Sequence, residues 1–473
     1  MRGDFTRDTF DRAKHFSRVL MQQGRVQLDS DWNEQTDIVL HYLRALARDL
    51  IGPYAGPNDR LGFRIVTDPD DAELKALPSP RKEVLLKAVK NGDFAIDVGR
   101  YYVQGVLVEN EHWLSYTEQR GYPFSEAAKL DHIKDKDGLV YLDVWERHIT
   151  YVEDDHIREP ALNGPDTCSR TQIIWQVKVL LPANSDDKLD CDSVNDLLPL
   201  GTGRLRARAR FDKEPPQLCV IPPEAKYRGA ENQLYRVEIH QGGTPVDGAT
   251  FKWSRENGAV VFPIRTLSGT VAVVEHLGRD KHLSLHEGNW VEIVDDDIAL
   301  SELPGVLAQV GSVDRDELTV SLTALAGLSL PTYGAADAGR HPLLRRWDHT
   351  GDPNAGGAIP VVEQATTAEA WIPLEDGIQI AFTKENGIYR TGDYWLIPAR
   401  TVTGDVDWPK EGNTEMGQSL PPHGPRHWFA PLAHLTDDPT KTESCLCVIQ
   451  PITKCDHAKR PTPAPERPRR PPR

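Results

Sequence analysis

Four residues near the C-terminus carry the side chains that zinc prefers. Cys445, Cys447, Cys455 and His457 would supply thiolates and an imidazole, the donor types of structural zinc sites. The spacing is unusual, because Cys-x-Cys replaces the common Cys-x-x-Cys and His457 follows Cys455 by only two residues. The spacing favours free thiols, or a disulfide bond formed after release of the protein, over zinc. We therefore expect no resident metal or cofactor, and these residues are the candidate zinc set.

Two short acidic clusters have the oxygen donors that hard cations prefer. They are Asp29-Ser-Asp31 and Asp295-Asp-Asp297. A local structural role fits both clusters better. Asp31 is placed to cap a helix, Asp29 would lie beside the positive end of that helix, and residues 295–297 would form a solvated turn after a strand.

The histidines of the C-terminal third do not form a metal-binding pattern. His423, His427 and Trp428 lie in a segment rich in Pro and Gly, with no partner at a spacing that requires a metal. The sequence also has no Gly-rich phosphate loop followed by Lys-Ser/Thr and no Gly-x-Ser-x-Gly elbow. We therefore expect that the protein is not an enzyme.

Glycan chemistry is the alternative that the composition leaves open. A glycoside hydrolase needs only two well-placed carboxylates, and the chain has 71 acidic residues. Trp145-Glu146, and Trp371 with Glu375-Asp376, would suit stacking on a sugar. Tryptophan is also ordinary core packing in β-rich proteins, and we favour packing for these residues.

Composition restricts the class of protein. A chain of 473 residues is too long for one compact core and predicts two to four domains. Its net charge of -16 argues against binding to nucleic acid. Six scattered cysteines do not resemble a secreted disulfide framework. The polar start Met1–Asp8 and the lack of a long apolar run predict synthesis and assembly in the cytoplasm, without a membrane span.

The elements that would position these residues begin with an N-terminal arm and a helix. The alternation of Val26 and Leu28 predicts a strand. Asp31 and Glu34 then form a capping-box pattern, which predicts a helix over residues 32–50 that ends at Gly52-Pro53. Apolar residues at alternating spacings of four and three form a seam of the heptad type. The seam consists of Trp32, Thr36, Val39, Leu43, Leu46 and Leu50.

The rest of the chain has the pattern of short β-strands. The strongest strands are expected at residues 138–152 and 169–181, where apolar residues recur with a period of two or in continuous runs. Residues 94–110 predict two strands around a turn at Gly99-Arg100, with a bulge or bend at Gly105. Asn257-Gly258 predicts a type I′ hairpin turn.

These patterns predict a mainly β, multi-domain protein of sandwich-like or barrel-like blocks. The expected division is an arm and helix over 1–57, a first β domain over 58–182, a linker or long loop over 183–224, a second β domain over 225–340, a third β block over 341–440, and a segment over 441–473 with Cys residues and a disordered Pro/Arg-rich tail.

Several runs together resemble an uncharacterised family of phage-tail-like proteins encoded beside contractile injection systems. The runs are Gly3–Arg7, residues 16–35, Tyr141–Arg147, Ala161–Thr167, Trp175–Lys178, Phe251–Gly258 and Thr391–Arg400. The resemblance implies a structural component of a contractile particle, at the baseplate or as an attachment protein for a fibre or spike. Members of the family often carry a further fibre-like module, and we expect this chain to have none.

The same resemblance implies partners. Baseplate or other particle proteins would bind the chain, and a homotrimer would form in the assembled particle, because fibre and spike parts are commonly trimeric. The seam Trp32, Val39, Leu43, Leu46 and Leu50 is the expected assembly interface. The alternative hypothesis is a β-rich protein that binds or hydrolyses glycan at the surface of a target cell.

Overall fold

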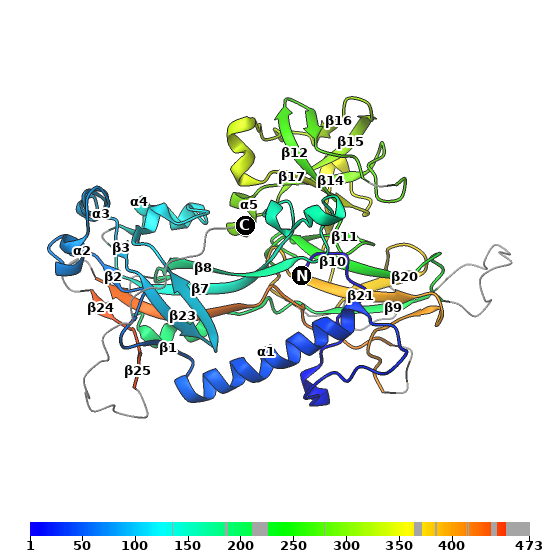
Figure 1. The fold of residues 1–473 in the computed structure, drawn as a ribbon. Coiled ribbons are helices and arrows are strands. Elements are labelled where there is room, and N and C mark those ends of the chain that lie inside the picture. Colours follow the sequence, from blue (N-terminus) through cyan, green and yellow to red (C-terminus); the bar gives the residue numbers. More distant parts are fainter. Residues whose placement is uncertain are drawn as a thin grey trace.

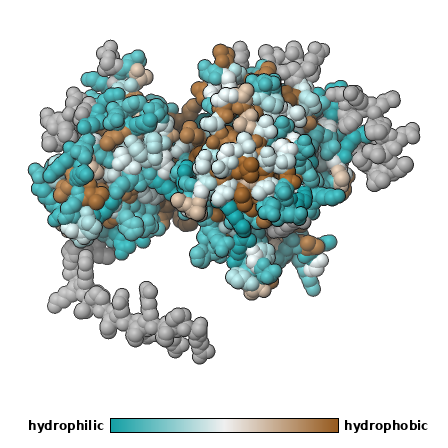
Figure 2. All heavy atoms as spheres, turned by 90° about the horizontal axis from the view of Figure 1, so that it is seen from above, coloured by the Kyte–Doolittle hydropathy of each residue, from teal (hydrophilic) through white to brown (hydrophobic). Residues whose placement is uncertain are grey.

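The protein is mainly β, as the sequence predicts, and its sheets form three bodies (Figure 1). The computed structural model describes residues 1–134, 136–184, 188–210, 226–278, 280–363, 371–383, 386–412, 414, 416–436 and 442–450. Seen from the barrel side, the surface narrows between two lobes, and hydrophilic residues cover most of the smaller lobe (Figure 2).

The first body, here the three-sheet body, surrounds a core that includes Phe63, Tyr101, Leu142 and Leu432. One sheet holds β1 (Tyr54–Pro57), β4 (Gly99–Val103), β5 (Val106–Asn110) and β25 (Val448–Ile449), a second holds β2 (Ile65–Val66), β3 (Ala95–Ile96) and β6 (Leu114–Ser115), and a third holds β7 (Gly138–Ile149), β8 (Arg170–Leu180), β23 (His427–Leu435) and β24 (Glu443–Ser444).

The second body is a closed barrel whose core includes Phe262, Ile293 and Leu344. Its strands, in order around the barrel, are β12 (Val261–Ser268), β13 (Val271–Val274), β16 (Thr319–Ala324), β15 (Val306–Asp314), β14 (Trp290–Val294) and β17 (Leu343–Trp347). Closure leaves the barrel without an unpaired sheet edge.

The third body, here the two-sheet body, packs two sheets around Tyr235, Phe251, Phe382 and Trp395. One sheet holds β18 (Ile359–Pro360), β11 (Thr250–Ser254), β10 (Gln233–Gln241), β21 (Tyr394–Arg400) and β22 (Asp405–Val406), and the other holds β19 (Ile372–Pro373), β20 (Ile378–Phe382) and β9 (Leu205–Ala209).

Helices are few and mostly short. They are α1 (Asp29–Ile51), α2 (Ala72–Ala76), α3 (Arg81–Lys90), α4 (Leu130–Ile133) and α5 (Asp296–Leu300), together with short segments of 3-10 helix. Among the described helices, none is both long enough and apolar enough to cross a bilayer.

The sheets do not follow the linear division that the sequence suggested. β23, from the expected third block, pairs with β7 along its length, and β10 of the expected second domain pairs with β21 of the third. The expected linker over 183–224 contributes β9, which pairs with β20. Pairing between distant segments is set by the fold as a whole, and local patterns do not reveal it.

Helix α1 differs from the prediction at its start. No strand forms at Val26, which is exposed, and the N-cap residue is Leu28 instead of Asp31. Asp31 lies inside the first turn, where its carboxylate accepts the backbone N–H of Leu28 at 3.2 Å. The predicted end is confirmed, because Gly52 is the C-cap. Figure 1 shows α1 along one edge of the molecule, on the side away from the barrel.

Two of the predicted turns also differ. Gly99 begins β4, and the turn between β4 and β5 lies instead at Gln104-Gly105, both with positive φ. The Asn257-Gly258 turn forms with positive φ at both residues. Its flanking strands do not pair with each other, however, because β11 joins the two-sheet body and β12 joins the barrel.

A disulfide bond corrects the expectation for the cysteines. Cys191 is bonded to Cys445, 254 residues away, which ties the segment after β8 to the strand pair β23–β24. Cys445 is therefore not available to zinc. Cys455 and His457 lie outside the described residues, as does the expected disordered tail, and Cys447 is an exposed free thiol.

The disulfide should stabilise the fold against unfolding. Replacing both Cys191→Ser and Cys445→Ser removes a cross-link that closes a long loop, and we expect the free energy of unfolding to fall by about 2–4 kcal/mol. Urea unfolding measures the change, and Cys168→Ser, at an exposed free thiol, is the control. Peptide mapping of the oxidised protein that linked Cys445 to another cysteine would contradict the assignment.

Candidate functional site

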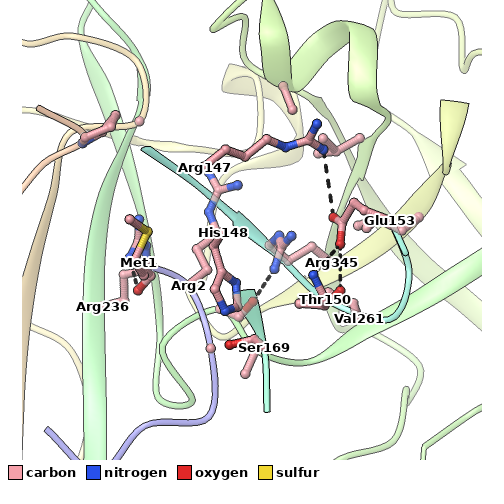
Figure 3. A pocket seen from close by; sticks show the side chains of 18 of the residues that line it. Met1, Arg2, Arg147, His148, Thr150, Glu153, Ser169, Arg236, Val261 and Arg345 are labelled. Atoms are coloured by element: carbon pink, nitrogen blue, oxygen red, sulfur yellow. Dashed lines mark hydrogen bonds and ion pairs between the residues drawn. The ribbon is translucent and has the colours of Figure 1, made fainter. Parts of the chain in front are cut away.

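The three bodies meet at a cavity of about 720 Å³ (Figure 3). The N-terminal arm from Met1 to Phe5 forms one wall, and the end of β7 around His148 forms another. The floor comes from β10 and β11 of the two-sheet body and from β14 and β17 of the barrel. The cavity thus lies where all three bodies and the arm converge.

The floor is built from strands whose polar face is buried. In β10, Arg236 and Glu238 alternate with Tyr235, Val237 and Ile239, which belong to the core of the two-sheet body. An alternating strand ordinarily exposes its polar face to water. Here the barrel and the arm cover that face, so Arg236 and Glu238 are only 2% and 1% exposed.

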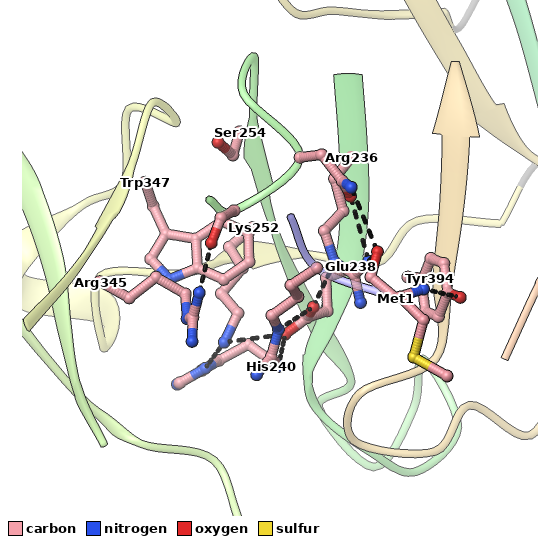
Figure 4. A network of polar contacts seen from close by, with 12 residues as sticks. Met1, Arg236, Glu238, His240, Lys252, Ser254, Arg345, Trp347 and Tyr394 are labelled. Atoms are coloured by element: carbon pink, nitrogen blue, oxygen red, sulfur yellow. Dashed lines mark hydrogen bonds and ion pairs between the residues drawn. The ribbon is translucent and has the colours of Figure 1, made fainter. Parts of the chain in front are cut away.

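The buried charges of the floor form a connected network (Figure 4). Lys252 Nζ lies 2.5 Å from Glu292 Oε1 on β14 and 3.4 Å from Glu238 Oε1 on β10. Glu238 also accepts hydrogen bonds from Arg236 Nε at 2.5 Å and from Arg2 Nε at 3.0 Å. The network therefore joins the two-sheet body, the barrel and the arm.

The network holds its carboxylates ionised. Burial alone would raise the pKa of Glu238, but Arg2, Arg236 and Lys252 outweigh burial and lower it. Burial likewise opposes the ionised form of Glu292, and Lys252 lowers the pKa of that carboxyl well below its usual range. Buried charges need such partners, since an unpaired buried ion is costly.

The arm is fixed by its backbone as well as by Arg2. The α-amino group of Met1 donates a hydrogen bond to Tyr394 Oη. Asn257 Nδ2 donates to the carbonyl oxygens of Met1 and Gly3, at 3.2 and 2.8 Å. The Asn257-Gly258 turn between the two-sheet body and the barrel thus binds the arm.

A second charged cluster lies beside the cavity and was not anticipated. His427 Nδ1 lies 2.6 Å from Asp143 Oδ1, and His427 Nε2 lies 2.9 Å from Glu302 Oε1. Lys178 Nζ lies 2.7 Å from Asp143 and 3.5 Å from Glu302. Burial favours neutral His427, but Glu302 and Asp143 outweigh it and raise the pKa of His427 to about 9.

These ligand-type atoms are close enough together to hold a metal ion. The ammonium group of Lys178 already supplies a cation to both carboxylates, and the raised pKa keeps the His427 imidazole protonated. A metal ion would therefore have to displace both the ammonium group of Lys178 and the proton of His427. The cluster is therefore better described as an ion network that joins β7, β8 and β23 to Glu302, which follows the C-cap of α5.

The predicted solvated turn at Asp295–Asp297 is wrong. Asp295 caps α5 through Ile298 N at 2.9 Å and pairs with Arg340 at 2.5 Å. Asp296 is buried and pairs with Arg147, Arg120 and His341. Arg147 lies on β7, so this acidic turn anchors the barrel to the three-sheet body and has no need of a cation.

Asp29 and the predicted histidine segment also have protein partners. The Asp29 carboxylate accepts the backbone N–H and the hydroxyl of Thr6 at 2.9 and 2.6 Å. His423 stacks on Tyr394, and Trp428 lies under the guanidinium of Arg44. None of these contacts brings the residues together as a metal site.

The tryptophan–carboxylate pairs make packing and ionic contacts. Trp145 is buried and stacks on His427, while Glu146 pairs with Arg44 of α1 at 2.6 Å. Arg208 covers Trp371 at 4.0 Å from the ring centroid. Glu375 accepts a hydrogen bond from Tyr235 and pairs with Arg255, and Asp376 takes a positive φ in the turn that precedes β20.

One further set of ligand-type atoms lies at the surface. Glu231, Glu256 and His282 bring three donor atoms together, with His282 Nε2 3.1 Å from Glu256 Oε1. His282 and Glu231 are largely exposed. Exposed groups of this kind are common without an ion.

The profile of a family of unknown function (DUF6519) matches residues 1–212 and 199–461. The chain belongs to this family. No curated protein and no solved structure matches the sequence. The DUF6519 match includes the arm, the ion networks and all three bodies, so the junction described here lies within the region that defines the family.

The sequence alone did not reveal the residues that hold the three bodies and the arm together in this DUF6519 protein. Glu238 and Lys252 stand at alternating positions in strands, where charge is normally explained by exposure to solvent. The available signal was the clustering of ionisable residues on adjacent strands, Arg236 and Glu238 on one and Lys252 on the next. That signal identifies a polar face but not the elements that cover it.

The His427 cluster predicts a pH dependence of stability. The folded pKa of about 9 lies above the ordinary value of 6.5. The imidazolium therefore contributes its full stabilisation below pH 6.5 and loses it as pH rises through 9. We expect wild-type protein to lose on the order of a few kcal/mol relative to His427→Gln between these limits. Thermal unfolding across the range measures the difference.

His156→Gln is the control, because His156 is fully exposed on the same body. Its pH profile should parallel that of the wild type. A constant difference between wild type and His427→Gln from pH 6 to pH 9.5 would show that His427 carries no buried charge.

Proposed function

We propose that this protein is a structural component of a contractile phage-tail-like particle, at the baseplate or as an attachment protein for a fibre or spike. We further propose that α1 is the surface by which it assembles. The resemblance of its sequence runs to proteins encoded with such particles supports the first part. The exposed apolar seam of α1 supports the second.

The seam lies on the outside of its own chain. Its apolar members have exposed fractions of 77% for Trp32, 54% for Val39, 58% for Leu43, 57% for Leu46 and 68% for Leu50. Contiguous exposed apolar side chains of this size on a soluble protein typically mark an interaction site.

The opposite face of α1 attaches the helix to the molecule mainly through polar contacts. Arg44 pairs with Glu146 of β7, and Glu34 accepts a hydrogen bond from Thr9 at 2.6 Å. Beside the seam, Gln35 accepts a hydrogen bond from Val19 N at 2.8 Å. Ile38 is the buried apolar residue of this face. An ordinary surface helix turns its apolar stripe to the core, so α1 is oriented for a partner outside the chain.

We propose that the seam packs against the same seam of two further copies of the chain. The spacing of four and three places Trp32, Thr36, Val39, Leu43, Leu46 and Leu50 on one line. This arrangement packs identical helices around an axis. Six positions form fewer than three heptads, too short for a stable coiled coil alone. We therefore expect a monomer in solution that trimerises when particle proteins hold the copies side by side.

Charged substitutions in the seam should abolish assembly without unfolding the protein. We expect Leu43→Asp with Leu46→Asp to fold with a change in Tm of no more than about 2 °C, because both positions face solvent. The double variant should be absent from purified particles, since association would bury the new carboxylates unpaired. Particle stoichiometry and circular dichroism give the two readouts.

A matched control uses exposed valines outside the seam. Val246→Asp with Val402→Asp changes the same number of apolar side chains, exposed by 92% and 95%, in the two-sheet body. This control should enter particles normally. Normal incorporation of the seam variant, or one copy per attachment site, would refute the trimeric interface.

Deleting residues 1–57 is a poor test of anchoring. The deletion would also remove Arg2 from the buried Glu238 network and leave that carboxylate with one partner fewer. The seam variant separates assembly from folding, and glycan-array and hydrolysis assays on the intact chain test the glycan alternative.

A further inference from the structure

The cavity at the junction contains a cation without an anionic partner. Arg345, on β17, donates one hydrogen bond from Nη1 to the carbonyl oxygen of Gly258. Among the described residues, no carboxylate oxygen lies within 4.0 Å of its guanidinium nitrogens, and its buried Nε has no hydrogen-bond partner. A guanidinium has five N–H donors, so most of the hydrogen-bonding capacity of Arg345 is unused.

The surroundings of Arg345 are crowded with positive charge. Arg236, Lys252 and Arg345 lie together in the floor (Figure 4), and Arg2 of the arm joins them. The floor strands supply the carboxylates of Glu238 and Glu292. Both carboxylates are already engaged by cations other than Arg345. Burial, followed by the repulsion of Arg2, lowers the pKa of Arg345 to about 10.

His148, on the wall formed by the end of β7, is affected by the same positive charges. Burial, followed by the Met1 amine, Arg345, Arg236 and Arg2, lowers the pKa of His148 to about 3. Its Nε2 is buried and has no hydrogen-bond partner. A neutral imidazole can donate from this nitrogen to a ligand.

Most carboxylates at the rim of the cavity are neutralised by their own partners. Glu146 pairs with Arg44, and Glu302 pairs with Lys178 and Arg390. Asp295 and Asp296 are held by the arginines described above. Glu292, Glu238 and Glu153 also act on Arg345 and oppose the lowering of its pKa, but none of them forms an ion pair with its guanidinium group among the described residues.

We propose that this cavity binds the oxyanion of a small molecule, a phosphate or carboxylate group, with Arg345 as the principal donor and His148 as a second donor. A guanidinium hydrogen-bonds such a group in a bidentate, charge-assisted manner. The cavity volume falls in the usual range for small-molecule sites. The ligand would contact the barrel through Arg345 and the three-sheet body through His148.

Titration of the intact protein with inorganic phosphate and with succinate tests the site. Calorimetry should show saturable binding of at least one of these probes at constant ionic strength, with sodium chloride as the reference salt. A response to phosphate but not to succinate assigns a phosphoryl ligand, and the reverse assigns a carboxylate. Lack of saturable binding of either probe in the millimolar range would overturn the proposal.

Arg345→Gln is the decisive variant. Removing a charge-assisted donor should weaken binding by about tenfold or more. Arg265→Gln, at an exposed arginine of the same barrel, should bind as the wild type does. Equal affinity in Arg345→Gln and wild type would place the ligand elsewhere.

The stability of the variants distinguishes a ligand site from a structural role. Arg345→Gln removes a buried charge without a carboxylate partner, so Tm without ligand should not fall. Glu238→Gln, which leaves Arg2 and Arg236 without their shared carboxylate, should lower Tm. If Arg345→Gln fails to fold, Arg345→Lys replaces it as the test, because lysine keeps the charge but lacks the planar set of guanidinium N–H donors. Unchanged affinity in Arg345→Lys would also overturn the proposal.

Discussion

The buried pairing of Glu238 and Glu292 with Lys252 is the constraint on which the arrangement of the three bodies depends. Glu238 and Lys252 belong to adjacent strands of the two-sheet body, whereas Glu292 belongs to the barrel. Separating the bodies would leave Glu292 without Lys252, and separating the arm would remove Arg2 from Glu238. Breaking one partner of a buried ion pair typically costs about 3–5 kcal/mol. The network therefore specifies one arrangement of sheets whose apolar cores are separate.

Other buried ion pairs of the junction likewise connect one body to another. Asp296 of α5 pairs with Arg147 of β7, which joins the barrel to the three-sheet body. Glu302, just after α5, reaches His427 and Lys178 of the same body. Apolar contacts would tolerate small shifts between bodies. Ion pairs with fixed hydrogen-bond geometry tolerate smaller shifts between the bodies. Because such pairs surround the cavity, they hold its shape.

Local patterns predicted the β class, the long strands β7 and β8, and the end of α1 at Gly52. They failed where a distant partner decides the outcome. The Asn257-Gly258 turn formed as predicted, yet its strands diverged, because β12 gains a closed barrel by pairing with β13 and β17. Cys191 and Cys445 were interpreted separately, since nothing local brings together residues separated by 254 positions.

The candidate site was hidden from the sequence for a related reason. A charged residue in an alternating strand is interpreted as exposed, and only the folded arrangement shows that the barrel and the arm cover Arg236 and Glu238. His427 was assigned to a loop, although it begins β23 and meets Asp143 across the sheet. The apolar seam of α1, in contrast, could be predicted from residue spacing alone, because the periodicity of a helix is a local property of the sequence.

The orientation of α1 connects its sequence to its proposed use. A helix of 23 residues that buries only Ser30 and Ile38 gains little from apolar packing on its own chain. Its polar face is nonetheless held in place, since Arg44 pairs with Glu146 and lies over Trp428. These contacts fix the rotation of the helix and present the seam outward as a preformed surface. A seam that is already ordered loses less conformational entropy on association than a disordered segment would, so even a short seam can contribute to assembly.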